Sequence, residues 1–226
     1  MSTCRTRYSK EARRKAIDTI ERNAKSQAAL IEDLLDVSRI TQGQLRLTWL
    51  PVHLPAIVAA AIDTIRPSAD AKGLTLATDL TVDPMLTVQG DPVRLQQVVW
   101  NLLSNAVKFT PQGGRVEAAL ALNSNYVQLR VSDNGRGIRP DFMPLIFDRF
   151  RRADVSSTAV GGGLGLGLAI ARQLVEMHGG TLSATSDGEN KGTTFIVRLP
   201  RMPDDAPLRR DERTAVSPIS KENVIP

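Results

Sequence analysis

Hydrophobic residues near the start of the chain recur at intervals of three and four positions, as they do along one side of an α-helix. This spacing predicts one long helix over residues 10–46. A helix with such a stripe needs a partner surface, as in a coiled coil or a helical bundle, because the stripe would otherwise face water. The stripe consists of Ile17, Ile20, Ala24, Ile31 and Leu34, and Leu30, Leu35, Val37 and Ile40 widen it.

After this helix the pattern becomes a mixture of strands and helices. Two prolines in "TWLPVHLP" predict a linker over residues 47–55, and "AIVAAAIDTI" predicts a helix that ends before Pro67. Five segments have strand character: "GLTLATDL", "RVEAALAL", "YVQLRVS", "TLSATS" and "TTFIVRL", of which the second and third suit a hairpin. Helical spacing returns in "VRLQQVVWNLLSNAVKF" and in "LGLAIARQLVEMH", which Gly179-Gly180 closes. Residues 56–200 therefore predict an α/β fold, a two-layer sandwich of a mixed β-sheet with helices on one face.

Charge and composition narrow the function classes. The net charge of +5 resides in residues 1–30, where eight Lys and Arg face three acids. Acids lie among these bases and Tyr8 is the single aromatic residue among them, which predicts a solvated helix face rather than a nucleic-acid surface. No run reaches the ~20 apolar residues of a membrane span, and the N-terminus lacks a signal peptide, so we expect a cytoplasmic protein. Cys4 is the single cysteine, which excludes an internal disulfide and a cysteine-based zinc site. We expect disorder in residues 1–9 and in the proline-containing tail 201–226.

A glycine-rich stretch, "GGGLGLGLAI" at residues 161–170, runs directly into a predicted helix. Glycine is favoured where the backbone approaches a ligand closely or adopts a positive φ. Free amides and the helix dipole at the start of a helix attract phosphate. This stretch alone is compatible with a phosphate-binding loop and with a flexible surface loop.

Polar side chains in two other segments suit a nucleotide. Asn101, Asn105 and Lys108 share one face of their predicted helix, where amide oxygen suits Mg²⁺ and ammonium suits phosphate, although a solvated polar face is the alternative. In "VSDNGRGI", Asp133 follows a strand and could accept a hydrogen bond from an exocyclic amine such as that of adenine. An ordinary Asp-Asn-Gly turn is the alternative there. The hydroxyls of "GTTF" could fix a water or a base edge, or belong to a β-turn.

Taken together, five stretches carry a family resemblance. "NLLSNAVKFT", "DNGRGI", "FDRFRRAD", "GGGLGLGLAI" and "GTTF" occur in the order of the N, G1, F, G2 and G3 boxes. Over residues 51–200 the chain resembles the catalytic ATP-binding domain of bacterial sensor histidine kinases, of the kind found in hybrid kinases. "AIDTIERNAKSQAALIEDLLDVSRI" resembles the second helix of their dimerisation domain. The resemblance implies a transferase of a two-component phosphorelay in signal transduction, with ATP and Mg²⁺ as nucleotide and metal.

The resemblance also assigns roles by matching positions. Asn105 would ligate Mg²⁺, Asn101 would support the phosphate side, and Lys108 would reach the phosphates. Asp133 would accept the adenine amine. Residues 138–162, with Phe147 and Phe150, would form a mobile lid. The remaining implied nucleotide-binding positions, which shape the adenine pocket or let backbone amides approach the phosphates, are Gly135, Gly137, Gly163, Gly165, Leu166, Gly167, Thr193 and Thr194.

The phosphoacceptor that a histidine kinase needs, a histidine followed by an acid and then a proline, has no match in this sequence. The chain has two histidines: His53 lies in the predicted linker, and His178 lies at a helix end, where a cationic ring would suit the dipole. We therefore expect a truncated kinase that cannot phosphorylate itself. Its partners would be a phosphoacceptor domain and a response regulator supplied in trans. We also expect a homodimer or weak oligomer through residues 10–46.

Two rival functions accompany this hypothesis. A related ATP hydrolase of the gyrase, mismatch-repair or chaperone type would also bind ATP, but such families place a glutamate base where this chain has Asn101. The absence of that base disfavours hydrolysis. A non-catalytic module that binds ATP and pairs with an intact kinase through residues 10–46 stays open, because loss of the acceptor leaves the nucleotide site untouched.

Overall fold

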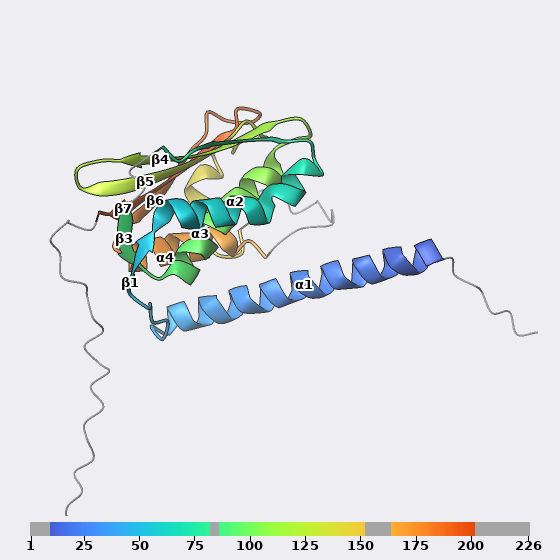
Figure 1. Ribbon diagram of the computed structural model, residues 1–226, viewed down its shortest axis with the longest axis horizontal. Coiled ribbons are helices and arrows are strands. Elements are labelled where there is room, and N and C mark those ends of the chain that lie inside the picture. The colour runs from blue at the N-terminus through green and yellow to red at the C-terminus, as the bar shows by residue number, and fades with distance from the viewer. Residues whose placement is uncertain (1–9, 82–85, 152–163, 202–226) are drawn as a thin grey trace, which may run out of the picture.

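A computed structural model, which describes residues 10–81, 86–151 and 164–201, shows a two-layer sandwich beside one long helix (Figure 1). The predicted N-terminal segment 1–9, residues 202–226 of the predicted tail 201–226, and residues 152–162 of the predicted lid 138–162 lie outside the described residues. The helices are α1 Lys10–Thr41, α2 Leu54–Asp70, α3 Pro92–Phe109 and α4 Gly167–Met177, with a 3₁₀ turn at Met143–Leu145. The strands are β1 Leu50–His53, β2 Thr75–Asp79, β3 Thr87–Gly90, β4 Arg115–Leu122, β5 Tyr126–Asp133, β6 Thr181–Thr185 and β7 Thr193–Pro200.

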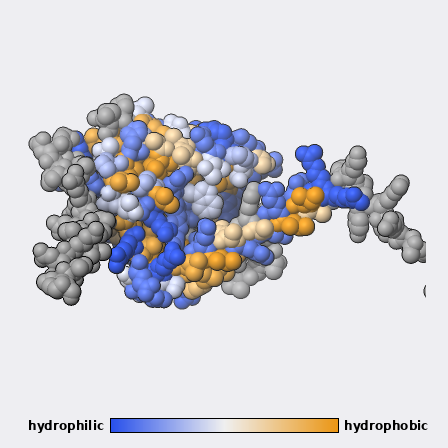
Figure 2. All heavy atoms as spheres, turned by 60° about the horizontal axis from the view of Figure 1, so that its bottom comes forward, coloured by the Kyte–Doolittle hydropathy of each residue, from blue (hydrophilic) through white to orange (hydrophobic). Residues whose placement is uncertain are grey.

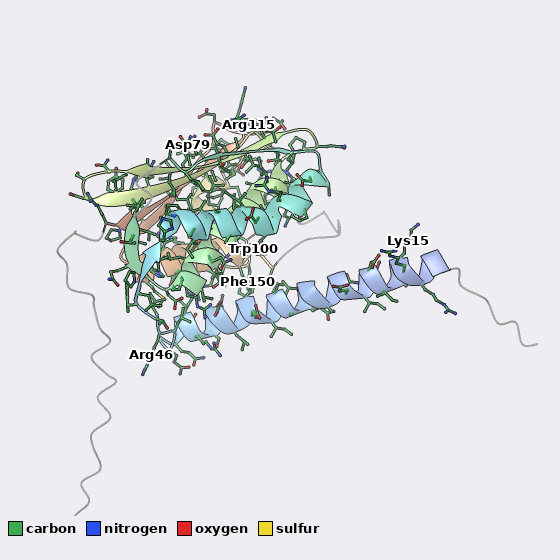
Figure 3. All side chains as sticks on the ribbon, viewed as in Figure 1. Lys15, Arg46, Asp79, Trp100, Arg115 and Phe150 are labelled. Carbon is green, nitrogen blue, oxygen red and sulfur yellow. The ribbon has the colours of Figure 1, made fainter. Side chains whose placement is uncertain are left out.

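The main sheet has five strands in the order β2-β4-β5-β7-β6, and helices α2, α3 and α4 cover one of its faces (Figure 1). β2 pairs with β4 in parallel and the other neighbours are antiparallel, so the sheet is mixed. This confirms the predicted fold class, including the β4–β5 hairpin. The opposite face carries polar side chains and is turned away from the helices, as Asp79 and Arg115 illustrate (Figure 3).

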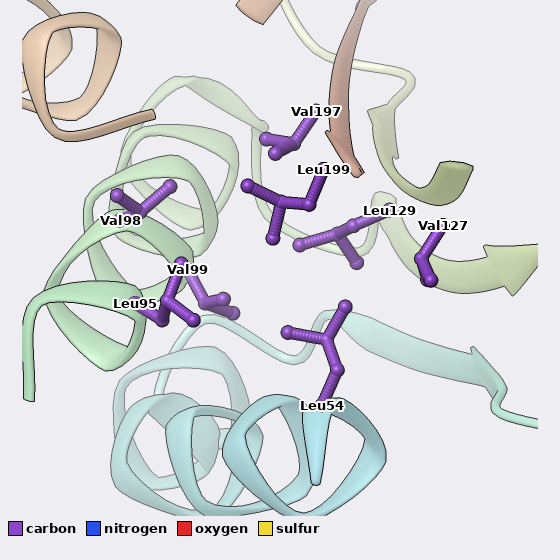
Figure 4. A pocket seen from close by; sticks show the side chains of 8 residues that line it. All are labelled: Leu54, Leu95, Val98, Val99, Val127, Leu129, Val197 and Leu199. Carbon is purple, nitrogen blue, oxygen red and sulfur yellow. The ribbon is translucent and has the colours of Figure 1, made fainter. Parts of the chain in front are cut away.

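The core lies between this sheet and the helices because the strands alternate buried and half-buried residues. It contains a small internal cavity whose lining is entirely aliphatic (Figure 4). Such a lining offers water no hydrogen-bond partner, so we assign the cavity to imperfect core packing. None of the predicted site residues lines it. The lining side chains are Leu54, Leu95, Val98, Val99, Val127, Leu129, Val197 and Leu199.

The region predicted as a linker over residues 47–55 contains a strand instead. Leu50–His53 forms β1, which pairs antiparallel with β3 in a separate two-stranded sheet. Leu54 then begins α2, which continues through Pro67 rather than ending before it. Pro67 is exposed, whereas Ile65 and Ala69 are buried on either side of it. Burial of these side chains holds the last turn although proline lacks an N–H for the helix.

The first helix ends earlier than residue 46, at Thr41. Gly43 has φ +64°, its N–H donates to the Ile40 carbonyl, and the Gln44 N–H donates to the Arg39 carbonyl. This pair of hydrogen bonds with a left-handed glycine is a Schellman motif, which closes helix ends. The hydrophobic pattern alone continued past this signal, so the predicted end was too late.

Near its C-terminal end, α1 contacts the sandwich. The carboxylate of Asp36, only 5% exposed, accepts hydrogen bonds from Arg94 at 2.6 Å and Gln97 at 2.8 Å, both on α3. Farther toward the N-terminus the hydrophobic stripe of α1 faces solvent, with Ile17 62% and Ile20 67% exposed (Figure 2). The partner surface that the stripe requires is therefore not supplied within the described residues. Among those residues, too, no helix is long and apolar enough to cross a membrane.

Candidate functional site

Helix α3 is the element around which the predicted site residues gather. Its start is fixed by Asp91, whose side chain accepts hydrogen bonds from the backbone N–H groups of Val93 and Arg94. One side of the helix is buried against the sheet, as predicted. Another side carries the polar row, in which Asn101 is buried, Asn105 is half-buried and Lys108 is exposed. The row therefore leads from the interior to the solvent. The buried side presents Leu95, Val98, Leu102 and Ala106.

Asn101 lies against the first residue of α4. A Cβ atom placed on Gly167 would come within 3.1 Å of Asn101 Oδ1, so glycine leaves room for this amide. Asn101 Nδ2 is buried and has no hydrogen-bond partner in the described part of the chain. The first N–H groups of a helix also lack intrahelical acceptors. An unsatisfied amide donor beside a helix N-terminus suits a bound anion such as phosphate.

The other residues of the glycine-rich stretch divide into different roles. Leu166 is 1% exposed, so its side chain belongs to the core and only its backbone can face a ligand. Gly165 has φ +72°, and a Cβ atom there would lie 2.6 Å from the Arg151 carbonyl oxygen. The Gly165 carbonyl also accepts the Phe150 N–H at 3.1 Å. Gly165 therefore packs against Phe150 and Arg151, so the two described segments on either side of residues 152–163 are in contact. Gly163 itself lies outside the described residues.

Asp133 stands at the end of β5, half-buried. Its Oδ1 accepts the Gly135 N–H at 2.8 Å, and the Thr193 N–H also bonds to the carboxylate. Burial raises the pKa of the Asp133 carboxyl, and these two hydrogen bonds act in the opposite direction. A carboxylate has about four acceptor positions, so further donors can still be accommodated.

The loop after Asp133 is packed on the end of α3. The Arg136 N–H donates to the Phe109 carbonyl at 3.2 Å, and a Cβ atom on Gly135 would lie 2.5 Å from the same oxygen. A Cβ atom on Gly137, where φ is +64°, would lie 2.0 Å from the Gly188 carbonyl oxygen. Packing by itself therefore requires glycine at both positions, whether or not a ligand is bound. The contacts bring the acceptor carboxylate of Asp133 to the same end of α3 as Lys108.

Only one of the two predicted threonines lies beside Asp133. Thr193 is buried and pairs directly with Asp133 across β7 and β5. Thr194 points to the opposite face of the sheet, where its hydroxyl lies 2.9 Å from that of Ser132. The structure therefore does not bring Thr194 into the site. Ser186, which the sequence did not single out, accepts the Ile138 N–H at 3.0 Å and donates to the Gly192 carbonyl at 2.6 Å. Its only sequence signal was a hydroxyl beside an Asp-Gly turn.

His178 is the C-cap residue of α4, as predicted, but its ring is neutral. Nδ1 lies 2.7 Å from the Leu174 carbonyl, and Nε2 accepts the Asp91 N–H at 3.0 Å. A ring that accepts through Nε2 carries its single proton on Nδ1. Burial lowers the pKa of His178. The predicted cationic ring is therefore wrong, because the side chain is enclosed between α4 and the start of α3 rather than exposed at the helix end.

This neutral histidine predicts acid-sensitive stability. A lowered pKa in the folded state means that the contribution of His178 is complete above the unfolded pKa of 6.5 and is lost as the pH falls toward the folded value. Protonation would remove the Asp91 hydrogen bond, at about 1 kcal/mol. Urea unfolding, followed by tryptophan fluorescence, measures the effect. The ring centroid of Trp49 lies 5.6 Å from that of His178.

His178→Gln, which can still accept the Asp91 N–H but does not titrate, is expected to lose less stability than wild type between pH 7 and pH 5. His53→Gln, at an exposed position, is the matched control and should behave as wild type. Identical pH dependence in His178→Gln and wild type would contradict the assignment.

Both the sequence and the structure of this chain are similar to those of known proteins. Residues 90–203 match the model of the histidine kinase-, DNA gyrase B- and HSP90-like ATPases. Hybrid signal transduction histidine kinase D of Dictyostelium discoideum is 37% identical over 217 residues, which cover 83% of this chain and 14% of that protein. The mycobacterial sensor histidine kinase MprB is similar in structure, with a TM-score of 0.60 and 31% identity over 69% of this chain and 99% of that one. Full-length ShkA in complex with AMPPNP has a TM-score of 0.73 and 28% identity over 90% of this chain and 42% of that one.

Proposed function

The chain belongs to the histidine kinase-, DNA gyrase B- and HSP90-like ATPase family, and we propose that it binds ATP with Mg²⁺ and transfers the γ-phosphate to a histidine on a separate domain. One observation carries the proposal. The buried Asn101 amide, with its unsatisfied Nδ2, lies beside the N-terminus of α4, while Asp133 lies at the C-terminal end of α3. An unsatisfied amide donor in the middle of α3 and an acceptor carboxylate beside its C-terminal end are thus held by one helix.

The proposed roles follow from the donors and acceptors that lie along α3 and beside it. Asp133 accepts a hydrogen bond from the exocyclic amine of adenine, with Thr193 beside it. The first N–H groups of α4, the Asn101 amide and the Lys108 ammonium bind phosphate oxygens. The Asn105 side-chain oxygen is the proposed magnesium ligand, since Mg²⁺ is held by few protein oxygens together with substrate phosphates. When bound, the metal neutralises charge that develops on the transferred phosphoryl group.

Transfer to another domain is favoured over hydrolysis and over transfer to a histidine of this chain. The Asn101 amide cannot take a proton from water, which disfavours hydrolysis. His178 is buried and both of its ring nitrogens are hydrogen-bonded, so it is not available as an acceptor. His53 is followed by Leu54 and Pro55 and lacks the neighbouring acid of a phosphoacceptor. The proposed acceptor is therefore a histidine of a separate domain, for which the residues described here bind and orient the nucleotide.

Calorimetric titration of the chain with AMPPNP tests the binding step. We expect one nucleotide per chain and an affinity that depends on Mg²⁺. Without the metal, nothing neutralises the triphosphate charge next to the Asn105 oxygen. Titration with the metal replaced by a chelator is the control. Absence of binding in the presence of Mg²⁺ would contradict the proposed function.

A further inference from the structure

Lys72 lies in the connection between α2 and β2, and its side chain reaches the C-terminal end of α3. The ammonium group donates to three backbone carbonyls: Val107 at 2.6 Å, Lys108 at 3.1 Å and Thr110 at 2.7 Å. The Lys72 carbonyl in turn accepts the Gly113 N–H at 3.2 Å. Both the side chain and the backbone of Lys72 therefore hold the segment in which α3 ends and the chain turns toward β4.

These contacts account for the carbonyls that a helix end leaves without partners. The last four carbonyls of a helix have no intrahelical donor, and they form the negative end of its dipole. Three protons on one ammonium match three of these oxygens. The fourth, on Phe109, accepts the N–H of Arg136 from the loop after Asp133. The end of α3 is thus fixed from one side by Lys72 and from the other by the Asp133 loop.

We propose that Lys72 is a positioning residue for the nucleotide site. It keeps the last turns of α3, which carry Asn105 and Lys108, at a fixed distance from the loop that carries Asp133. This inference rests on the proposed function, in which a nucleotide contacts both parts at once. A ligand that spans two groups loses affinity when their separation changes, whereas a ligand that occupies one of them is much less affected. Burial and the nearby Arg136 charge lower the pKa of Lys72, in keeping with a partly desolvated ammonium.

Lys72→Met tests the proposal, because methionine keeps an unbranched side chain and removes the three donors. Calorimetry with AMPPNP and with adenosine, both in Mg²⁺, separates positioning from folding. We expect Lys72→Met to weaken AMPPNP binding by about tenfold and adenosine binding by less than about twofold. Lys72→Arg, which retains a charged donor group, is expected to restore most of the AMPPNP affinity.

Val127→Ala provides the control for a purely structural effect. Val127 is fully buried in the core and lines the internal cavity, so its truncation lowers stability without touching the site. Its ratio of AMPPNP to adenosine affinity is expected to equal that of wild type. Should the methionine variant not fold, Lys72→Gln, which keeps two donors without the charge, takes its place in the same comparison.

The outcomes separate the two proposals. Failure of the wild-type chain to bind AMPPNP would overturn the proposed function itself. Binding by wild type, together with an unchanged affinity ratio in the Lys72 variants, would overturn the positioning role alone. The same would follow if Val127→Ala shifted the ratio as far as Lys72→Met, or if Lys72→Arg gave no recovery.

Discussion

Asp133→Asn is expected to weaken AMPPNP binding by about 1–3 kcal/mol, or roughly 5–150-fold, because a buried polar contact to the base is disrupted. Asparagine has one side-chain oxygen, and the backbone N–H groups of Gly135 and Thr193 already compete for it. Its amide nitrogen is a donor and would face the donor amine of adenine. Calorimetric titration in Mg²⁺ measures the loss.

The same variant should fold as well as wild type, which separates binding from stability. Because the pKa of Asp133 is raised in the folded protein, its contribution to stability is complete below the unfolded value of 3.8 and is lost as the pH rises through the folded value. Asparagine removes this dependence and loses at most one backbone hydrogen bond. We expect a melting temperature near that of wild type. Asp141→Asn, at an exposed position, is the matched control, and equal AMPPNP affinity in wild type and Asp133→Asn would refute the adenine assignment.

Asn105→Ala is expected to lower the rate of phosphoryl transfer to a supplied acceptor by about 10²–10³-fold, the range for losing one electrostatic contact to a transition state. It should also abolish the Mg²⁺ dependence of AMPPNP binding, because the proposed ligand oxygen is gone. The rate is measured with radiolabelled ATP, and the metal dependence by titration with and without Mg²⁺.

The helix itself should tolerate this change. Asn105 is half-buried and lies away from both ends of α3. At such a position alanine has a higher helix propensity than asparagine. Asn125→Ala, in the exposed turn between β4 and β5, is the control and should leave both properties unchanged. Retention of the Mg²⁺ dependence in Asn105→Ala would exclude Asn105 as the metal ligand.

Local patterns in the sequence were sufficient for the elements that build the site. The spacing of Leu95, Val98 and Leu102 placed the buried side of α3, and with it the polar row on another side. Alternation in two neighbouring segments predicted the hairpin that ends at Asp133. These features depend on residues a few positions apart, which is the range over which helix and strand periodicity acts.

Features that depend on partners far away in the sequence could not be predicted from local patterns. β1 pairs with β3, which comes after α2 and β2 in the sequence. Because this partner is distant, the residues of β1 were predicted to be a linker. The neutral ring of His178 depends on the N–H of Asp91, 87 residues away. Lys72 gave no pattern at all, because its partners are backbone carbonyls of a helix end 35 to 38 residues later. Tertiary packing, rather than local propensity, decides such contacts.

Phosphoryl transfer in trans tests the central claim most directly. The chain is incubated with Mg²⁺ and ATP labelled at the γ-phosphate, alone and with a separate dimerisation domain that carries a phosphoacceptor histidine. We predict that the chain alone stays unlabelled and that the added domain acquires acid-labile, base-stable label, as phosphohistidine does. An unlabelled acceptor domain accompanied by rapid release of free phosphate would contradict the account and favour the hydrolase. An unlabelled acceptor without phosphate release would contradict it in favour of a non-catalytic module.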